Sequence, residues 1–201
     1  MTPQLRRLEP AFYERRALEL APLLVGKVLV VQTDDGLSAG RIVETEAYEG
    51  PQDLAAHSAG GRRTKRTEVM FGPAGHAYMF LLYGTSWAFN IVAATREVPH
   101  AVLVRAIEPI VGIDAMVTRR GMEAGRRELC NGPGKLCKAL GLTGAHYGQS
   151  LASDTLYIAD GSPARVGKSP RINIDYAGAW VKRAWRFYER GNRYVSVAPR
   201  H

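Results

Sequence analysis

Cysteine is scarce in this 201-residue chain, which contains only Cys130 and Cys137. Two thiols are too few for a disulfide framework and too few for a cysteine-ligated zinc site. His57 has no second histidine or cysteine at ligand spacing, which argues further against a metal site. We therefore expect two buried thiols in a reducing cytoplasm, and neither a metal nor a cofactor.

Long apolar runs are also missing. No run reaches the length of a membrane span, and the first seven residues, MTPQLRR, lack the apolar centre of a signal peptide. The hydrophobic content of 46% and the charged content of 23% are ordinary for a soluble globular protein. We expect a single domain over residues 1–201, in the cytoplasm, monomeric and without a membrane partner.

Acidic residues are outnumbered, because 27 lysines and arginines face 19 aspartates and glutamates. Residues 161–201 hold nine basic side chains, Arg200 among them, and two acidic ones, which accounts for seven of the eight net positive charges. A second basic cluster comprises Arg62, Arg63, Lys65 and Arg66. Clustered positive charge predicts a polyanionic partner, most often nucleic acid. The alternative is a solvated basic face without a partner.

Hydrophobic patterning predicts an α+β protein with mostly antiparallel strands. Tyr13, Ala17 and Leu20 recur at helical spacing, which predicts a helix over 11–21 that Pro22 breaks or kinks, in a segment that ends at Gly26. Residues 49–76 read as a long irregular loop of the kind that is usually functional. The expected strands are 27–33, 37–48 (with a bulge at Gly40), 77–82, 87–94, 101–107 (ending before Pro109), 156–159, 165–166, 171–174, 185–188 and 194–197. Two further helices are expected over 111–120 and 135–140.

One strand combines acidic and aromatic side chains in an otherwise basic chain. On an extended strand, Glu44, Glu46 and Tyr48 point to one face. A glutamate facing a polar site can act as a general base that activates water. Hydrolysis at an anomeric carbon suits such a carboxylate, because the transition state carries positive charge. The alternative is a solvent-facing glutamate on an edge strand, and alternation alone favours that alternative.

Other aromatic and glycine-rich positions are ambiguous by themselves. Phe80 shares a strand face with Tyr78 and is as typical of a core as of a pocket. Tyr83 occupies the tip of the predicted 77–94 hairpin, where an aromatic is a poor core residue and a plausible wedge into a base stack. The run Gly132-Pro133-Gly134-Lys135 opens a helix, which suits a phosphate without having P-loop spacing.

Along nearly its whole length, the chain resembles the alkyladenine (3-methyladenine) DNA glycosylases of the alkylpurine-glycosylase type found in mammals and many bacteria. The match is ordered and collinear, and therefore specific. It is carried by residues 24–27, 40–48 (GRIVETEAY), 55–58 (AAHS), 70–73 (MFGP), 83–84, 101–106 (AVLVRA), 131–136 (NGPGKL) and 186–188 (RFY).

The resemblance implies a fold and a reaction. The fold would be one compact domain with a curved antiparallel sheet, flanking helices and a hairpin that projects from a basic face. The reaction would be hydrolysis of the N-glycosidic bond of a flipped purine in double-stranded DNA. Glu46 matches the glutamate that deprotonates the attacking water. Arg105 matches the arginine that helps hold this water, and the backbone near Ile172 would complete the water site.

The resemblance also implies how the lesion is bound. Tyr48 matches the aromatic on one face of the flipped base, and His57 and Phe80 match the pair on its other face. Asn90 matches the asparagine that crowds the 2-amino group of guanine, and Tyr83 the side chain that fills the gap in the duplex. Implied substrates are 3-methyladenine, 7-methylguanine, hypoxanthine and ethenoadenine. Members of this family look monofunctional, so no lysine Schiff base and no metal are expected.

The chain departs from the mammalian pattern at two places. Phe80 stands where those enzymes have tyrosine, so stacking is kept while a hydroxyl is lost. Thr85 and Ser86 replace bulkier residues behind the wedge, which predicts a looser minor-groove contact. Two rival functions remain at this point. One is a non-catalytic nucleic-acid-binding module in which Glu46 is a surface acid, and the other is a hydrolase acting on small nucleosides.

Overall fold

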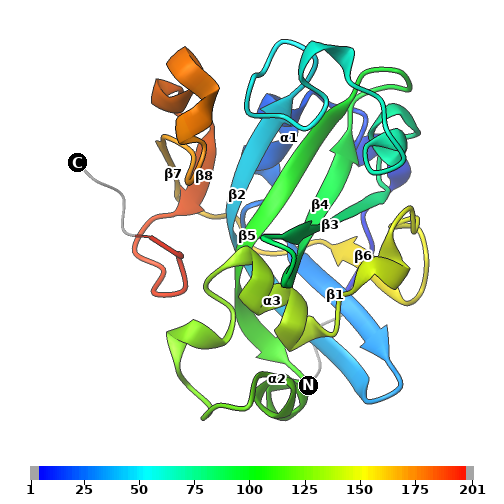
Figure 1. Cartoon of the computed structure of the whole chain (residues 1–201). Helices are drawn as coiled ribbons and strands as arrows, with labels where there is room; N and C mark the ends of the chain where they lie inside the picture. The colour runs from blue at the N-terminus through cyan, green and yellow to red at the C-terminus, as the bar shows by residue number, and fades with distance from the viewer. Residues whose placement is uncertain (1–4, 198–201) are drawn as a thin grey trace.

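The computed structural model describes residues 5–197, which form an open sheet flanked by short helices (Figure 1). Eight strands belong to the sheet: β1 (Val28–Thr33), β2 (Gly36–Glu49), β3 (Ala77–Leu82), β4 (Ser86–Ala93), β5 (His100–Val111), β6 (Leu156–Ala159), β7 (Val166–Ser169) and β8 (Arg186–Glu189). The main order is β3-β4-β5-β2-β1-β6, and β8 pairs with both β2 and β7. All of these pairings are antiparallel, which confirms the predicted α+β class.

The strand β2 is central to this sheet. It pairs along its length with β5 on one side, and with β1 and then β8 on the other. The predicted bulge at Gly40 is confirmed by a register shift between Ala39 and Gly40. A second irregularity lies between Ile42 and Thr45. A bulge changes which face a side chain points to. Ile42 and Ala47 therefore both reach the main core, although strict alternation would place them on opposite faces.

Strict alternation on the neighbouring strands separates the core from a polar face. Met79, Phe89, Ile91, Val102 and Val104 belong to the main hydrophobic core. The residues between them in sequence line a cleft: Tyr78, Phe80, Asn90, Leu103 and Arg105. This is the two-residue periodicity of a sheet with one face buried in the core.

Among residues 5–197, three α-helices complete the fold: α1 (Ala17–Leu24), α2 (Ile113–Arg120) and α3 (Pro133–Leu140). Side chains of α1 and α3 belong to the same core cluster. Shorter 3-10 segments are Pro10–Phe12, Ala59–Gly61, Glu68–Phe71, Arg127–Leu129, Gly144–His146 and Asp175–Lys182. Within residues 5–197, no helix is both long and apolar enough to cross a bilayer.

Several predicted boundaries were wrong. The first helix starts at Ala17 and continues through Pro22, because burial of Leu20 and Leu24 outweighs the loss of one backbone donor. Strand β5 continues past Pro109, which pairs opposite Gly40 at the bulge, a place where a proline is tolerated in a sheet.

Two predicted strands are absent. Residues 171–174 and 194–197 contain β-prone side chains but form bends and turns. Asn173 has φ of 57°, a left-handed conformation that is incompatible with a strand.

Candidate active site

A cleft of about 540 Å³ opens on the polar face of the sheet, beside the β3–β4 hairpin. Ten of the fourteen residues predicted for the site contribute to its lining. Strands supply one part of the wall, and the loop after β2, the start of α3 and the segment after β7 supply the rest. The predicted residues that line it are Tyr48, His57, Arg66, Phe80, Tyr83, Thr85, Asn90, Arg105, Lys135 and Ile172.

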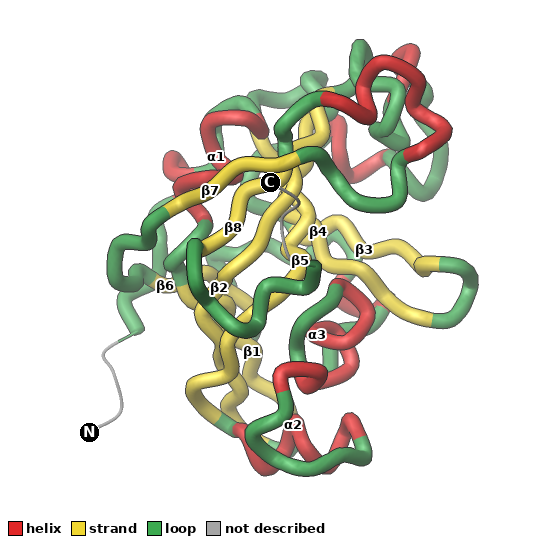
Figure 2. The backbone as a smooth tube through the Cα atoms, turned by 90° about the vertical axis from the view of Figure 1, so that its left-hand side faces the viewer, coloured by secondary structure: helices red, strands yellow, loops and turns green. Residues whose placement is uncertain are grey.

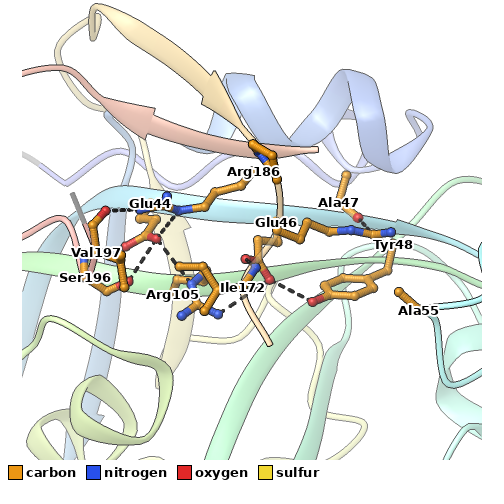
Figure 3. A network of polar contacts seen from close by, with 12 residues as sticks. Glu44, Glu46, Ala47, Tyr48, Ala55, Arg105, Ile172, Arg186, Ser196 and Val197 are labelled. Carbon is orange, nitrogen blue, oxygen red and sulfur yellow. Dashed lines mark hydrogen bonds and ion pairs between the residues drawn. The ribbon is translucent and has the colours of Figure 1, made fainter. Parts of the chain in front are cut away.

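Glu46 lies directly beneath this cleft and is completely buried. Its Oε1 accepts a hydrogen bond of 2.8 Å from the backbone N–H of Ile172, and its Oε2 accepts one of 2.7 Å from the hydroxyl of Tyr48 (Figure 3). The Nη1 of Arg105 lies 3.5 Å from the same Oε2. The alternative of a solvent-facing glutamate on an edge strand is therefore wrong, because β2 is central and Glu46 is buried among donors.

Glu44 occupies a different environment from Glu46. Its Oε1 accepts from Arg105 Nε at 3.2 Å, from Arg186 Nε at 2.5 Å and from the Ser196 hydroxyl. Its Oε2 accepts from the backbone N–H of Ser196. This carboxylate is saturated with partners, whereas both hydrogen-bond donors to Glu46 belong to residues that line the cleft. Burial alone would lower the pKa of Arg105, but the carboxylates of Glu46 and Glu44 outweigh this and raise it. Arg105 therefore stays cationic beside Glu46.

Tyr48 connects the cleft to the buried carboxylate. Burial, together with the negative charge of Glu46 and the hydrogen bond to it, raises the pKa of the Tyr48 phenol well above its usual value. The phenol therefore remains protonated and donates to Glu46 throughout the physiological pH range. Its ring lines the cleft, so one residue both orients the carboxylate and offers an aromatic surface.

The opposite part of the lining is a cluster of aromatic rings. The ring centroids of His57 and Phe80 are 4.6 Å apart with the planes nearly perpendicular, and Tyr78 lies 5.5 Å from Phe80. The Nδ1 of His57 is 2.7 Å from the Tyr78 hydroxyl. Burial, and then the charges of Arg66 and Arg62, lower the pKa of His57 to about 4. His57 is consequently neutral at pH 7, so it does not repel a cationic ligand in the cleft.

We expect a pH titration of His57 to have a midpoint near 4, compared with an ordinary value of about 6.5. Because the folded pKa is below the unfolded one, the contribution of His57 to stability is lost as the pH falls from about 6.5 towards 4. The measurement is an NMR titration of the imidazole carbon shifts in histidine-labelled protein. A midpoint of 6 or above for His57 would contradict the buried, neutral side chain.

Asn90 lies in the cleft wall, and Tyr83 lies at the tip of the β3–β4 hairpin. Asn90 is buried on β4, and its side-chain amide donates to the Tyr78 carbonyl at 3.1 Å, which fixes its orientation at the cleft wall. Tyr83 is 85% exposed at the tip of the β3–β4 hairpin, which projects from the body of the protein (Figure 2). Its φ of 49° lies in the left-handed region, and Thr85 beside it is also exposed.

The predicted basic residues fall into three environments. Arg66 and Lys135 line the cleft, and Lys135 Nζ donates to Asn131 Oδ1 at 2.8 Å. Arg62 and Lys65 are exposed outside the cleft. Arg63 is exposed but pairs with Glu68 and Glu97, so part of its charge is already balanced.

The C-terminal basic residues do not form one surface. Arg171 and Arg186 are buried in ion pairs, with Asp53 and Glu44 respectively, so they cannot contribute to a solvent-facing patch. Arg200 lies outside the described residues. The net charge of residues 161–201 is therefore larger than the positive charge that they present to solvent for binding a polyanion.

Sequence reasoning missed two features of this site. Tyr78 was treated only as a neighbour of Phe80, although it bonds His57 and lines the cleft. The ion pair between Arg171 and Asp53 joins residues 118 positions apart, and no local pattern signals it. Within the described part of the chain, no group of three or more His, Cys, Asp and Glu side chains could hold a metal ion.

Comparison with known proteins agrees with this geometry. The family model for methylpurine-DNA glycosylase matches residues 11–193. A Bacillus subtilis (strain 168) protein named "Putative 3-methyladenine DNA glycosylase" is 50% identical over 199 residues, covering 98% of this chain and all of the relative. A protein of the same name from Bacillus thuringiensis (strain Al Hakam) is 49% identical and covers 93% of this chain and 97% of the relative. The chain therefore belongs to the methylpurine-DNA glycosylase family.

Proposed function

We propose that this protein is a DNA-repair glycosylase that removes alkylated or deaminated purines from double-stranded DNA and leaves an abasic site. The observation that carries the proposal is the buried carboxylate of Glu46, held by two donors directly beneath an aromatic-lined cleft. Family membership supports the activity class. The substrates proposed are 3-methyladenine, 7-methylguanine, hypoxanthine and ethenoadenine.

Glu46 acts as the general base. It takes a proton from a water molecule while the water oxygen forms a bond to C1′ and the C1′–N9 bond breaks, with the electron pair leaving on the base. Positive charge develops on the sugar in this transition state, and the nearby carboxylate stabilises it. Arg105 holds the water, and the backbone near Ile172 completes the water site. The mechanism uses no lysine Schiff base, so the enzyme is monofunctional.

The cleft selects the base. A target base must leave the stack before water can reach C1′, and Tyr83 fills the gap that it leaves. Tyr48 stacks on one face of the flipped base, and His57 and Phe80 contact the other. A cationic 3-methyl- or 7-methylpurine gains a cation–π contact of about 1–2 kcal/mol in such a desolvated aromatic site. Asn90 crowds the 2-amino group of guanine and thereby protects that normal base.

The basic residues bind the backbone. The residues proposed to contact DNA are Arg66 and Lys135 at the cleft and Arg62, Lys65 and Thr85 nearby. Arg63 also contacts DNA, and it gives up its ion pairs to do so. Phosphate contacts of this kind make the affinity fall steeply with salt. A non-catalytic binding module would need none of the donors that hold Glu46, and a hydrolase of small nucleosides would not need the exposed aromatic at the hairpin tip.

The test is release of a damaged base. The protein is incubated, with EDTA present, with duplexes that each contain one 3-methyladenine, hypoxanthine or ethenoadenine, and abasic sites are then cleaved with hot alkali. We expect strand cleavage at the lesion after alkali but none before it, because hydrolysis leaves the sugar-phosphate backbone intact. Cleavage without alkali would contradict the monofunctional mechanism, and no release from any of the duplexes would contradict the enzyme.

A further inference from the structure

Arg171 is a buried cation that the proposed reaction does not yet use. Its side chain and that of its partner Asp53 are both completely inaccessible to solvent. The two form a bidentate pair, with Nη1–Oδ2 at 2.5 Å and Nη2–Oδ1 at 2.8 Å, and Nη1 also donates to the Ala47 carbonyl at 2.8 Å. A buried ion pair is often no more stabilising than apolar residues in its place. Stability alone therefore does not explain why this ion pair is buried here. Its contacts with the residues of the site offer another reason.

One contact of Arg171 is with the aromatic ring that faces the cleft. The guanidinium carbon lies 4.7 Å from the centroid of the Tyr48 ring and 5.0 Å from that of Trp185. Tyr48 also lines the cleft, so Arg171 covers one face of its ring and the other face remains for a ligand. The stack fixes the plane of the ring, and with it the direction in which the Tyr48 hydroxyl points.

A second contact runs through the backbone. The residue after Arg171 is Ile172, whose N–H donates to Glu46 Oε1, while the Tyr48 hydroxyl donates to Glu46 Oε2 (Figure 3). Both donors that hold the Glu46 carboxylate are therefore attached to Arg171, one through the peptide bond and the other through the ring stack. The segment has no strand structure of its own, so side-chain anchoring must hold it in place.

Asp53 extends the same anchor to the opposite wall. Its carboxylate accepts from the backbone N–H of Glu49 at 3.2 Å and from that of Ala55 at 3.0 Å. Glu49 is the last residue of β2, and Ala55 belongs to the loop that leads to His57. One ion pair thus ties together the end of β2, the segment around Ile172 and the loop that carries the aromatic wall.

We propose that Arg171, clamped by Asp53, is a positioning residue that fixes the orientation of the Glu46 carboxylate and of the Tyr48 ring. The inference rests on the proposed excision reaction, in which Glu46 must aim a lone pair at a bound water. Small displacements of such a base are costly, because an error of about 1 Å can reduce a rate a hundredfold. Loss of the clamp therefore slows the chemical step more than it weakens DNA binding.

The test compares Arg171→Met and Arg171→Lys with the wild-type protein. Methionine keeps apolar bulk, whereas lysine keeps the charge but cannot form the bidentate pair. We expect both variants to lower the single-turnover excision rate about 30-fold at saturating enzyme, while the Kd for a duplex with an abasic-site analogue changes less than threefold. In hydrogen-exchange NMR, the Ile172 amide is expected to exchange at least tenfold faster than in the wild type.

The matched control is Arg41→Met. Arg41 forms a comparable two-point pair with Glu189, at 2.8 and 3.0 Å, and also bonds backbone carbonyls, but it does not line the cleft. This control is expected to lower the unfolding temperature without changing the excision rate of the folded protein or the exchange of Ile172.

Two results would overturn the inference: an unchanged Ile172 amide with unchanged excision in the Arg171 variants, or an equal loss of excision in Arg41→Met. If the wild-type protein releases no base, the proposed function fails, and the Ile172 exchange experiment decides the positioning role by itself.

Discussion

Replacing Glu46 by glutamine is expected to reduce base release from a lesion-containing duplex by about a thousandfold or more. Glutamine has nearly the same shape, but its amide cannot take a proton from water, and general-base catalysis contributes on the order of 10²–10⁴-fold. The substitution also removes the negative charge beneath the developing cation on the sugar. One side-chain oxygen remains to accept from Tyr48 or Ile172, so the fold of the site is expected to survive.

The measurement is a single-turnover excision assay beside a binding titration with a duplex that contains an abasic-site analogue. Binding is expected to remain close to that of the wild type, because Glu46 is buried beneath the cleft and does not reach the backbone of the DNA. Glu108→Gln is the matched control, since Glu108 lies on β5 of the same sheet and pairs with Asn192 away from the cleft. If Glu46→Gln retained turnover, the general base would have to be another residue.

Replacing Tyr83 by alanine is expected to lower excision from duplex DNA about a hundredfold. The side chain is 85% exposed and stands at the tip of a projecting hairpin, where it can enter the stack only if the target base has left it. Unstacking a base step costs a few kcal/mol, and a wedge offsets part of that cost. Without the wedge, the flipped state is less populated and the chemical step is reached less often.

Single-stranded DNA provides the internal control for this variant. A lesion in a single strand needs no opening of a duplex, so Tyr83→Ala is expected to excise it at nearly the wild-type rate. The free energy of unfolding should change by no more than about 0.5 kcal/mol, because the removed ring is exposed and lies outside every core cluster. Equal losses on single-stranded and duplex substrates would show that Tyr83 acts on something other than base flipping.

The strand pattern was largely predictable from the sequence. The expected strands 77–82, 87–94 and 101–107 correspond to β3, β4 and β5, and the bulge at Gly40 was also predicted. The boundaries that were wrong depend on tertiary contacts. Pro22 continues a helix because its neighbours are buried, and Pro109 stays in β5 because it lies opposite a bulge on another strand. Neither the burial around Pro22 nor the bulge opposite Pro109 can be read from the residues next to these prolines.

The candidate site was predictable mainly through the resemblance. Strand alternation placed Glu44, Glu46 and Tyr48 on one face but left the two glutamates equivalent. The resemblance singled out Glu46, and the fold adds a difference in environment. Glu44 is saturated by Arg105, Arg186 and Ser196. Glu46 is instead held by Tyr48 and Ile172, which both line the cleft. The clamp of Arg171 on Asp53 depends on chain segments that meet only after folding, so no spacing rule could have indicated it.

The partners of Glu44 have a consequence for protein synthesis. The hydrogen bonds that anchor this carboxylate, and through it Arg105, come partly from Ser196, so the network joins β2 to residues near the C-terminal end of the described chain. A chain emerging from the ribosome acquires β2 and β5 early but receives Arg186 and Ser196 only near completion. A nascent chain would therefore fold most of its sheet before it acquired a fully anchored site.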